Sequence, residues 1–311
     1  MMARFILVRL ARAFLTVAIV VTFAFVVLRA SGDPALALLS PETPAEAVEA
    51  FRKAWGLDAP LWVQYGRYLF AVVHGDLGQS MRDGRAAIAI VAERIPVTLM
   101  LTAPALILNL MIGIPSGIYA ALRRDSFADR LVMMVAVVGF TVPSFVLGLV
   151  FVLAFAVELS WFPSGGAGTW HHLVLPVITL GLGGAAVLAR FSRSAMLEVL
   201  GQPYIRAASA KGVPWPSVVT GHALPNAAIA VLTVVGFMVG NLISGTVLVE
   251  SVFSWPGIGS LLVVSVASRD LAVVQCILLV VAAAMISTNL TIDLLYGMLD
   301  PRLRDLRSGR R

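Results

Sequence analysis

The sequence predicts an all-α fold: a polytopic membrane bundle of six transmembrane helices, with a small external helical region and a short cytoplasmic helix. Hydrophobic residues make up 59% and charged residues 13% of the 311 residues, and no soluble domain of this length needs so apolar a composition. Six apolar runs, uncharged except for two arginines at the start of the first, are long enough to cross about 30 Å of hydrocarbon. Basic residues gather at the ends of these runs, so the net charge of +6 indicates membrane orientation rather than nucleic-acid binding.

Each apolar run is a predicted membrane span. The spans are Leu7–Leu28, Val97–Leu122, Leu131–Val157, Leu173–Ala189, Asn226–Val249 and Leu271–Ile292. In the first run, three arginines precede Ala13–Leu28, as in a secretory signal. These 16 residues are uncharged and the arginine stems can snorkel at their inner end, which favours a retained span, with a cleavable signal as the alternative. The fourth is short at 17 residues, and uncharged sequence upstream can lengthen it. An even number of spans places both termini on one side of the membrane.

Lysine and arginine residues predict which side that is. Fifteen of the 23 lie before or at the start of the first run, in the second and fourth connections, or after the last run. These are Arg4, Arg9, Arg12, Arg123, Arg124, Arg130, Arg190, Arg193, Arg206, Lys211, Arg302, Arg304, Arg307, Arg310 and Arg311. Seven of the other eight belong to residues 29–94, a segment long enough to escape the charge rule. Both termini are therefore predicted to be cytoplasmic.

Three parts are predicted along the chain. Residues 1–29 hold the N-terminus and first span, residues 30–94 an external helical region, and residues 95–311 a five-helix core.

The external region has its own helix signals. The T-P-x-E sequence starting at Thr43 matches a capping box, and Gly56 predicts the end of that helix. A second helix is predicted from Pro60 and a third over residues 85–94. Contact with a partner and shielding of the bundle are both open roles for this region.

A polar stretch, Tyr204–Pro225, separates the fourth and fifth spans. Its first part, Tyr204–Lys211, predicts a short helix, and Gly212 follows where a left-handed cap favours glycine. Two prolines then break the helix, and Pro225 predicts the next turn. Another protein could contact such a helix and move it together with the two adjacent spans. The alternative is an ordinary basic cytoplasmic loop.

Polar residues inside the spans are expected to turn toward the bundle interior or a cavity. Asn109, Asn241 and Ser244 are candidates to line a pathway. The apolar stretch after the fifth span is interrupted near Trp255 and Pro256, which predicts a re-entrant or interfacial helix at the outer end of the pathway. A lipid-facing surface helix is the alternative.

Glycines spaced four residues apart predict close helix packing or a subunit interface. These pairs are Gly113 with Gly117 and Gly236 with Gly240.

Enzyme chemistry has no positive support in the sequence. No phosphate-binding loop, nucleophile elbow or H-E-x-x-H helix occurs, so no catalytic, cofactor or metal site is predicted. His171 and His172 suit a membrane interface better than a metal site, since no carboxylate or thiol is near them. Cys276 is expected to be a buried hydrophobe, and Asp293 to lie at the cytoplasmic boundary rather than relay protons.

From Phe5 to Arg304 the sequence resembles the permease subunits of bacterial dipeptide/oligopeptide-type ABC importers, in particular the first of the two homologous permeases, and eight motifs carry the resemblance. The motifs are GDLGQS (75–80), RIPVTLMLT (94–102), GIPSGIYAALRRDSFAD (113–129), TVPSFVLGL (141–149), LPVITLGL (175–182), ARFSRSAMLEVL (189–200), VESVFSWPGIG (249–259) and DLLYGMLDPRLR (293–304). Their order and spacing together make the resemblance specific.

The resemblance implies that the Tyr204–Lys211 helix is a coupling helix, which docks into a groove on a cytoplasmic ATPase. The family pattern E-A-A-x-x-x-G-x9-I-x-L-P and the peptide-permease pattern Y-x-R-x-A-x-A-K-G identify the matching residues as Tyr204, Arg206, Ala207, Ala208, Lys211, Gly212, Leu224 and Pro225. Arg206 replaces the general glutamate, His222 stands at the isoleucine position, and Ser209 stands where the peptide branch usually has arginine.

The resemblance also implies the partners and the place of the chain. It implies a heterodimer with a second permease, two ATPases that bind the ATP, and an external substrate-binding protein, in a bacterial inner membrane. Dipeptides, oligopeptides, nickel chelates, opines and glutathione remain open as cargo. A secondary transporter or channel without ATPases, and a non-transporting scaffold, are the alternatives from the residues alone.

Overall fold

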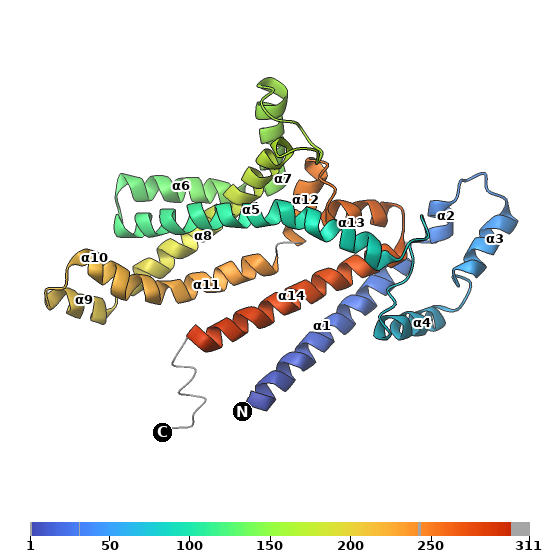
Figure 1. The fold of residues 1–311 in the computed structure, drawn as a ribbon, viewed down its shortest axis with the longest axis horizontal. Helices are drawn as coiled ribbons and strands as arrows, with labels where there is room; N and C mark the ends of the chain where they lie inside the picture. The colour runs from blue at the N-terminus through green and yellow to red at the C-terminus, as the bar shows by residue number, and fades with distance from the viewer. Residues whose placement is uncertain (1, 31, 242–243, 300–311) are drawn as a thin grey trace. The chain divides into compact units, whose positions relative to one another are not determined.

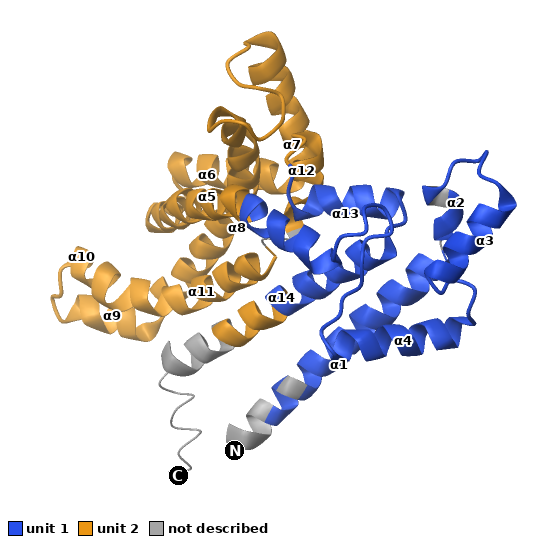
Figure 2. Ribbon diagram, turned by 45° about the vertical axis from the view of Figure 1, so that its right-hand side comes forward, with its two compact units in different colours: residues 1–98, 256–284 blue, residues 99–255, 285–311 orange. Residues whose placement is uncertain are grey.

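The computed structural model describes residues 2–30, 32–241 and 244–299, and within them the elements are helices and turns without a β-strand (Figure 1). Two compact units divide the chain (Figure 2). The N-terminal unit holds residues 1–98 and 256–284, and the central unit holds residues 99–255 and 285–311. The all-α membrane bundle predicted from composition is confirmed.

Five described helices are long and apolar enough to cross a membrane, and a bent pair brings the number to six. Four of them are α1 (Met2–Ala30), α5 (Ala87–Leu122), α8 (His171–Leu200) and α14 (Leu271–Leu299). The fifth is the continuous helix Trp215–Gly240, whose last part is α11 (Leu224–Gly240). Each contains most of one predicted run. The fourth run is extended mainly downstream, since α8 continues to Leu200.

The third predicted span is broken instead of straight. Its two parts, α6 (Phe127–Thr141) and the helix Ser144–Glu158, meet at 99°. The second part consists of α7 (Ser144–Phe151) followed by the π-helix η1 (Val152–Glu158). Pro143 causes the break, because proline lacks an N–H and pushes the residue before it out of the helical region. Val142 accordingly has φ −76° and ψ 119°.

The fifth span also ends earlier than predicted. Helix α11 stops at Gly240, and Asn241 is its C-cap. The 3-10 helix η3 (Ser244–Thr246) and the short helix α12 (Val247–Val252) follow. The predicted run Asn226–Val249 is therefore apolar but does not form one continuous helix.

The region after the first span contains α2 (Pro34–Leu38), α3 (Ala45–Ala54) and α4 (Leu61–Val73). The predicted capping box is wrong: Pro44 is the N-cap of α3 and makes no side-chain cap bond. Gly56 has φ +63° and ends α3 as predicted. The helical piece predicted at residues 85–94 is helical from Ala87 onward, but it forms the first turns of α5 and not a helix of the external region.

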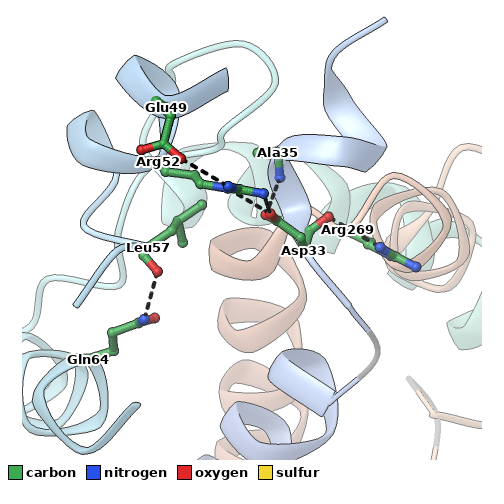
Figure 3. Close-up of polar contacts among 7 residues, drawn as sticks. All are labelled: Asp33, Ala35, Glu49, Arg52, Leu57, Gln64 and Arg269. Atoms are coloured by element: carbon green, nitrogen blue, oxygen red, sulfur yellow. Dashed lines mark hydrogen bonds and ion pairs between the residues drawn. The ribbon is translucent and has the colours of Figure 1, made fainter. Parts of the chain in front are cut away.

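One residue, Asp33, connects α2 and α3 to the turn before α14 (Figure 3). The Asp33 side chain accepts from Ala35 N at 2.9 Å, which caps α2, and from Arg52 Nη2 at 2.5 Å. This hydrogen bond, together with the charge of Asp33, raises the pKa of Arg52. The Asp33 carbonyl accepts from Arg269 Nη1 at 3.2 Å.

The core of the central unit forms where α8 meets its neighbours. Leu188, Met196, Val218 and Ala223 are fully buried there. A Cβ added at Gly113 would lie 2.8 Å from the carbonyl oxygen of Ala185 on α8, so this glycine lets α5 approach the backbone of α8 closely. The packing predicted from the Gly113 and Gly117 spacing is confirmed, since Gly117 faces the next turns of α8.

The N-terminal unit packs α1 against α14 and the helix α13 (Ile258–Ala267). Leu28, Leu271 and Val274 form a buried cluster. Cys276 is 0% exposed, which confirms that it is a buried residue. Helix α13 is the short apolar helix predicted after the proline and glycine break.

Candidate functional site

Helix α9 (Pro203–Ala210) lies within one residue of its predicted bounds. Gln202 is an extended N-cap, and the proline at N1 has the φ that a helix needs. Lys211 is the C-cap, and Gly212 follows with φ +79°. Val213 N bonds to Ala208 O at 3.3 Å, which satisfies one of the last carbonyls of the helix, as a left-handed glycine cap allows.

One face of α9 is held by the core of its own unit. Ile205 is 2% exposed and belongs to the buried cluster that contains Met196 and Val218, and Ala208 packs on that cluster. The structure therefore separates two alanines that the sequence treats alike, since Ala207 is exposed whereas Ala208 is half-buried.

The other face of α9 is open. Tyr204 is 43% exposed, and Arg206 and Lys211 are exposed. The guanidinium of Arg206 donates to the carbonyl of Gly201 at 3.2 Å. A partner would therefore meet an aromatic ring, a small alanine and two cationic side chains.

The segment after α9 runs as one helical path into α11 (Figure 1). It consists of α10 (Trp215–Val218) and the π-helix η2 (Val219–Ala223). The turn predicted at Pro225 is wrong, because the helix continues through this residue. In the wider π turn, Leu224 N donates to Val219 O, and Pro225 lies in the first turn of α11, where proline is tolerated. Leu224 packs on the core cluster, and Pro225 is exposed.

A buried ion pair ties α6 to α8. Arg193 Nε lies 2.6 Å from Asp129 Oδ1, and Arg193 Nη2 lies 2.7 Å from Oδ2. The carboxylate also accepts from Asp125 N at 3.0 Å, and Ser126 caps α6 by accepting from Asp129 N. Sequence reasoning missed this pair, although both residues lie in the motifs that carry the resemblance.

A cavity of about 180 Å³ lies in the central unit, and although most of its lining is apolar, it brings together two of the predicted pathway residues, Asn109 and Asn241. With its amide nitrogen facing the carbonyls, Asn109 bonds to Ala105 O at 3.1 Å and to Gly181 O. Asn241 Nδ2 donates to Phe237 O at 2.9 Å.

Three polar residues of this cavity region were missed by sequence reasoning. Thr102 and Thr246 line the cavity, and the buried hydroxyl of Thr102 has no hydrogen-bond partner among the described residues. Thr246 Oγ1 donates to the carboxylate of Glu250 at 3.1 Å, and Glu250 is 0% exposed. A threonine inside an apolar run, such as Thr102, is a sequence signal for a polar position in the bundle, and a search for charged residues overlooks it.

The other predicted pathway residues are not placed in the cavity. Trp255 is 4% exposed, and its backbone N–H donates to the carbonyl oxygen of Glu250 at 2.8 Å. Pro256 belongs to the N-terminal unit, where its carbonyl accepts from Arg94 Nη1 at 3.0 Å. The side chains of Ser244 and Asp293 lie outside the described part of the chain.

Metal-ligating clusters do not occur among the described residues. The ring of His172 bonds instead to the hydroxyl of Thr169 at 3.0 Å.

Two family descriptions cover almost the whole chain. Residues 113–305 match the binding-protein-dependent transport system inner membrane component, and residues 2–102 match the N-terminal part of the same kind of membrane component. Among curated relatives, the glutathione transport system permease protein GsiC of Escherichia coli O6:H1 is 43% identical over 273 residues, 88% of this chain and 89% of the relative. GsiC of Salmonella paratyphi A is 42% identical over 290 residues, 93% and 94% of the two chains.

A solved structure shares the fold. A chain from the MetNI methionine ABC transporter, in inward-facing conformations, aligns with a TM-score of 0.59 at 18% identity, over 68% of this chain and 97% of that one. Helical architecture, family match and extensive identity to permeases agree. The chain therefore belongs to the binding-protein-dependent transport system inner membrane component family and is a multi-pass inner-membrane permease subunit of an ABC importer, not an enzyme.

Proposed function

We propose that this permease forms one half of a heterodimeric translocation pathway and that α9 is the helix on which a cytoplasmic ATPase acts. Family membership implies ATPase and binding-protein partners in general. Because the chain is a permease subunit of an ABC importer, the alternative functions as a secondary transporter, a channel or a non-transporting scaffold are excluded. The proposal adds a second homologous permease, two ATPase subunits, an external binding protein, and both termini on the cytoplasmic side.

The burial pattern of α9 is the observation that carries the proposal. Ile205 anchors the inner face in the core shared by α8, α10 and α11, while Tyr204, Ala207 and Lys211 stay exposed on the outer side. A force on the outer face is therefore transmitted to two long helices rather than absorbed in a loop. ATPase closure would shift the equilibrium between inward-open and outward-open packings through such contacts.

The orientation follows from charge. The connection that contains α9 carries Arg190, Arg193, Arg206 and Lys211, and the positive-inside rule places such connections in the cytoplasm. An ATPase there could meet Arg206 and Lys211 with acidic side chains.

The cavity at Asn109 and Asn241 is proposed as part of the pathway. Its polar groups are hydroxyls and amides from α5 and the segment after α11, which suits a small polar solute in transit. We propose a peptide or related small solute as cargo, and glutathione in particular, because the relatives that match most of the chain are named for glutathione transport.

Replacing Gly212 by valine tests the coupling role. A Cβ at Gly212 would meet no atom within 4 Å, so the φ of +79° is the main source of strain, on the order of 1–2 kcal/mol for a residue other than glycine. The strain should distort the C-terminal end of α9. In proteoliposomes containing the whole importer, we expect substrate taken up per ATP hydrolysed to fall while the chain still inserts.

Gly221→Val is the matched control. Gly221 lies in the same segment with open space around it and without a positive φ, so uptake per ATP should stay near the wild-type value. Normal uptake by the Gly212 variant, or an equal loss in both variants, would contradict the coupling role.

A further inference from the structure

We propose that a phospholipid binds beside α1, with an acyl chain in an apolar cavity and its phosphate on Arg269. The cavity lies within the N-terminal unit, between α1, α13 and α14, and has a volume of about 330 Å³. Side chains that line it include Phe23, Val27, Leu262 and Val266. This volume is at the lower end of the range of about 300–1,000 Å³ for ligand pockets.

The position of the cavity along the helices places it at membrane depth. Phe23 and Val27 occupy the last turns of the first span, and Leu278 lies in the second turn of α14. Phe23 is 65%, Val27 46% and Val266 49% exposed. Apolar side chains exposed at this depth contact hydrocarbon, so the mouth of the cavity opens toward lipid chains.

The lipid-facing surface of α1 continues into the cavity. Ile19, Phe23 and Val26 are exposed along the same helix, with exposed fractions of 58%, 65% and 54%. An apolar cavity left empty loses dispersion contacts on its inner wall. An acyl chain of the surrounding bilayer restores those contacts without bringing a polar group to a site that cannot pair with it.

Arg269 is the charged residue of the lining, and it lies just before α14 begins. Its Nη1 donates to the carbonyl of Asp33 at 3.2 Å (Figure 3). Within the described ranges, Nε and Nη2 have no hydrogen-bond partner. These N–H groups can donate to phosphate oxygens, which a guanidinium binds in a planar, bidentate manner.

The backbone at Arg269 supports a role for its side chain. Arg269 has φ +54°, a left-handed conformation that glycine or asparagine would adopt with less strain. Gly32 has φ +121°, and a Cβ there would lie 2.6 Å from Arg269 Nη1. The turn therefore contains an arginine where a smaller residue fits better, and the facing loop leaves room for its guanidinium.

Charge favours a phospholipid over the second permease as the occupant. A phosphate at the end of the spans matches the single guanidinium at the rim, and an acyl chain matches the apolar wall. The inference does not depend on α9 or on the direction of transport.

Native mass spectrometry of the chain, purified in mild detergent with the subunits that co-purify with it, tests the proposal. Dioleoyl phosphatidylglycerol is added stepwise, and the apparent dissociation constant of the first retained lipid is measured. We expect Arg269→Gln to weaken binding about tenfold, in line with the loss of hydrogen bonds to a charged group. Val266→Trp should fill the cavity and abolish retention of that lipid.

Arg82→Gln is the matched control, because Arg82 is an exposed arginine of the same unit that does not line the cavity. It should bind lipid as the wild type does. The measured mass of the complex shows directly whether each variant still assembles. Equal lipid retention by wild type, Arg269→Gln and Val266→Trp would overturn the proposal. So would efficient cross-linking of a cysteine at Val27 to the second permease, which would identify that subunit as the occupant.

Discussion

Removal of Asp129 should loosen α6 from α8. The carboxylate is 3% exposed and accepts two hydrogen bonds from Arg193 and one from the backbone of Asp125. Breaking a buried pair by removing one partner costs about 3–5 kcal/mol, and the partial exposure of Arg193, 23% at its side chain, favours the lower end. We therefore expect Asp129→Leu to cost about 3 kcal/mol of local stability.

Hydrogen exchange measured by mass spectrometry can detect this loss of stability in the peptides that contain α6. If α6 opens from α8 as a unit, 3 kcal/mol corresponds to about a hundredfold faster exchange of the amides in the first turns of α6. Arg193→Met should have a similar effect, because it leaves the carboxylate buried without its partner. The double variant should recover much of the protection, because no unpaired charge then remains.

An exposed pair provides the control for this experiment. The ion pair between Arg85 and Glu93 has side chains 49% and 57% exposed. Exposed pairs contribute little because water and salt screen them, so Glu93→Gln should leave exchange unchanged. If Asp129→Leu exchanged as slowly as Glu93→Gln, the ion pair would not be what holds α6 on α8.

Two further predictions concern packing. Gly113→Ala should destabilise the chain by about 1–3 kcal/mol in thermal unfolding, because the added Cβ would lie 2.7 Å from Leu188 Cβ. Gly183→Ala is the control: its Cβ would meet no atom within 4 Å, so its thermal unfolding should be nearly unchanged. Cys276, 0% exposed, should resist a maleimide dye in the folded chain and react on heating; fast labelling of the folded protein would show that this packing is wrong.

Local chemistry made several elements predictable. The long apolar runs identify the membrane helices because a span must be apolar over its whole length, whatever its neighbours are. The bounds of α9 were predictable because Gly212 favours a left-handed backbone that needs no distant contact.

Other local signals were overridden by their surroundings. The T-P-x-E pattern predicts a cap at Thr43, yet Pro44 takes the N-cap position. Pro225 predicts a turn, but the π turn at Val219–Ala223 shifts the hydrogen bonds so that the helix continues. Pro143, which lies inside an unbroken apolar run, bends the third span by 99°. Hydrophobicity reports the environment of a segment and not its direction.

By itself, the sequence determined the class of the protein, its membrane runs and the short helix α9, because these depend on composition and on residues close together in the chain. Only the tertiary structure decided which polar groups meet. Asn109 and Asn241 share a cavity, Asp129 pairs with Arg193, and Ile205 rather than Ala207 faces the core. Residues 64 or more positions apart can be paired only by the packing of helices, since periodicity fixes a residue's place on its own helix but not the neighbour that faces it.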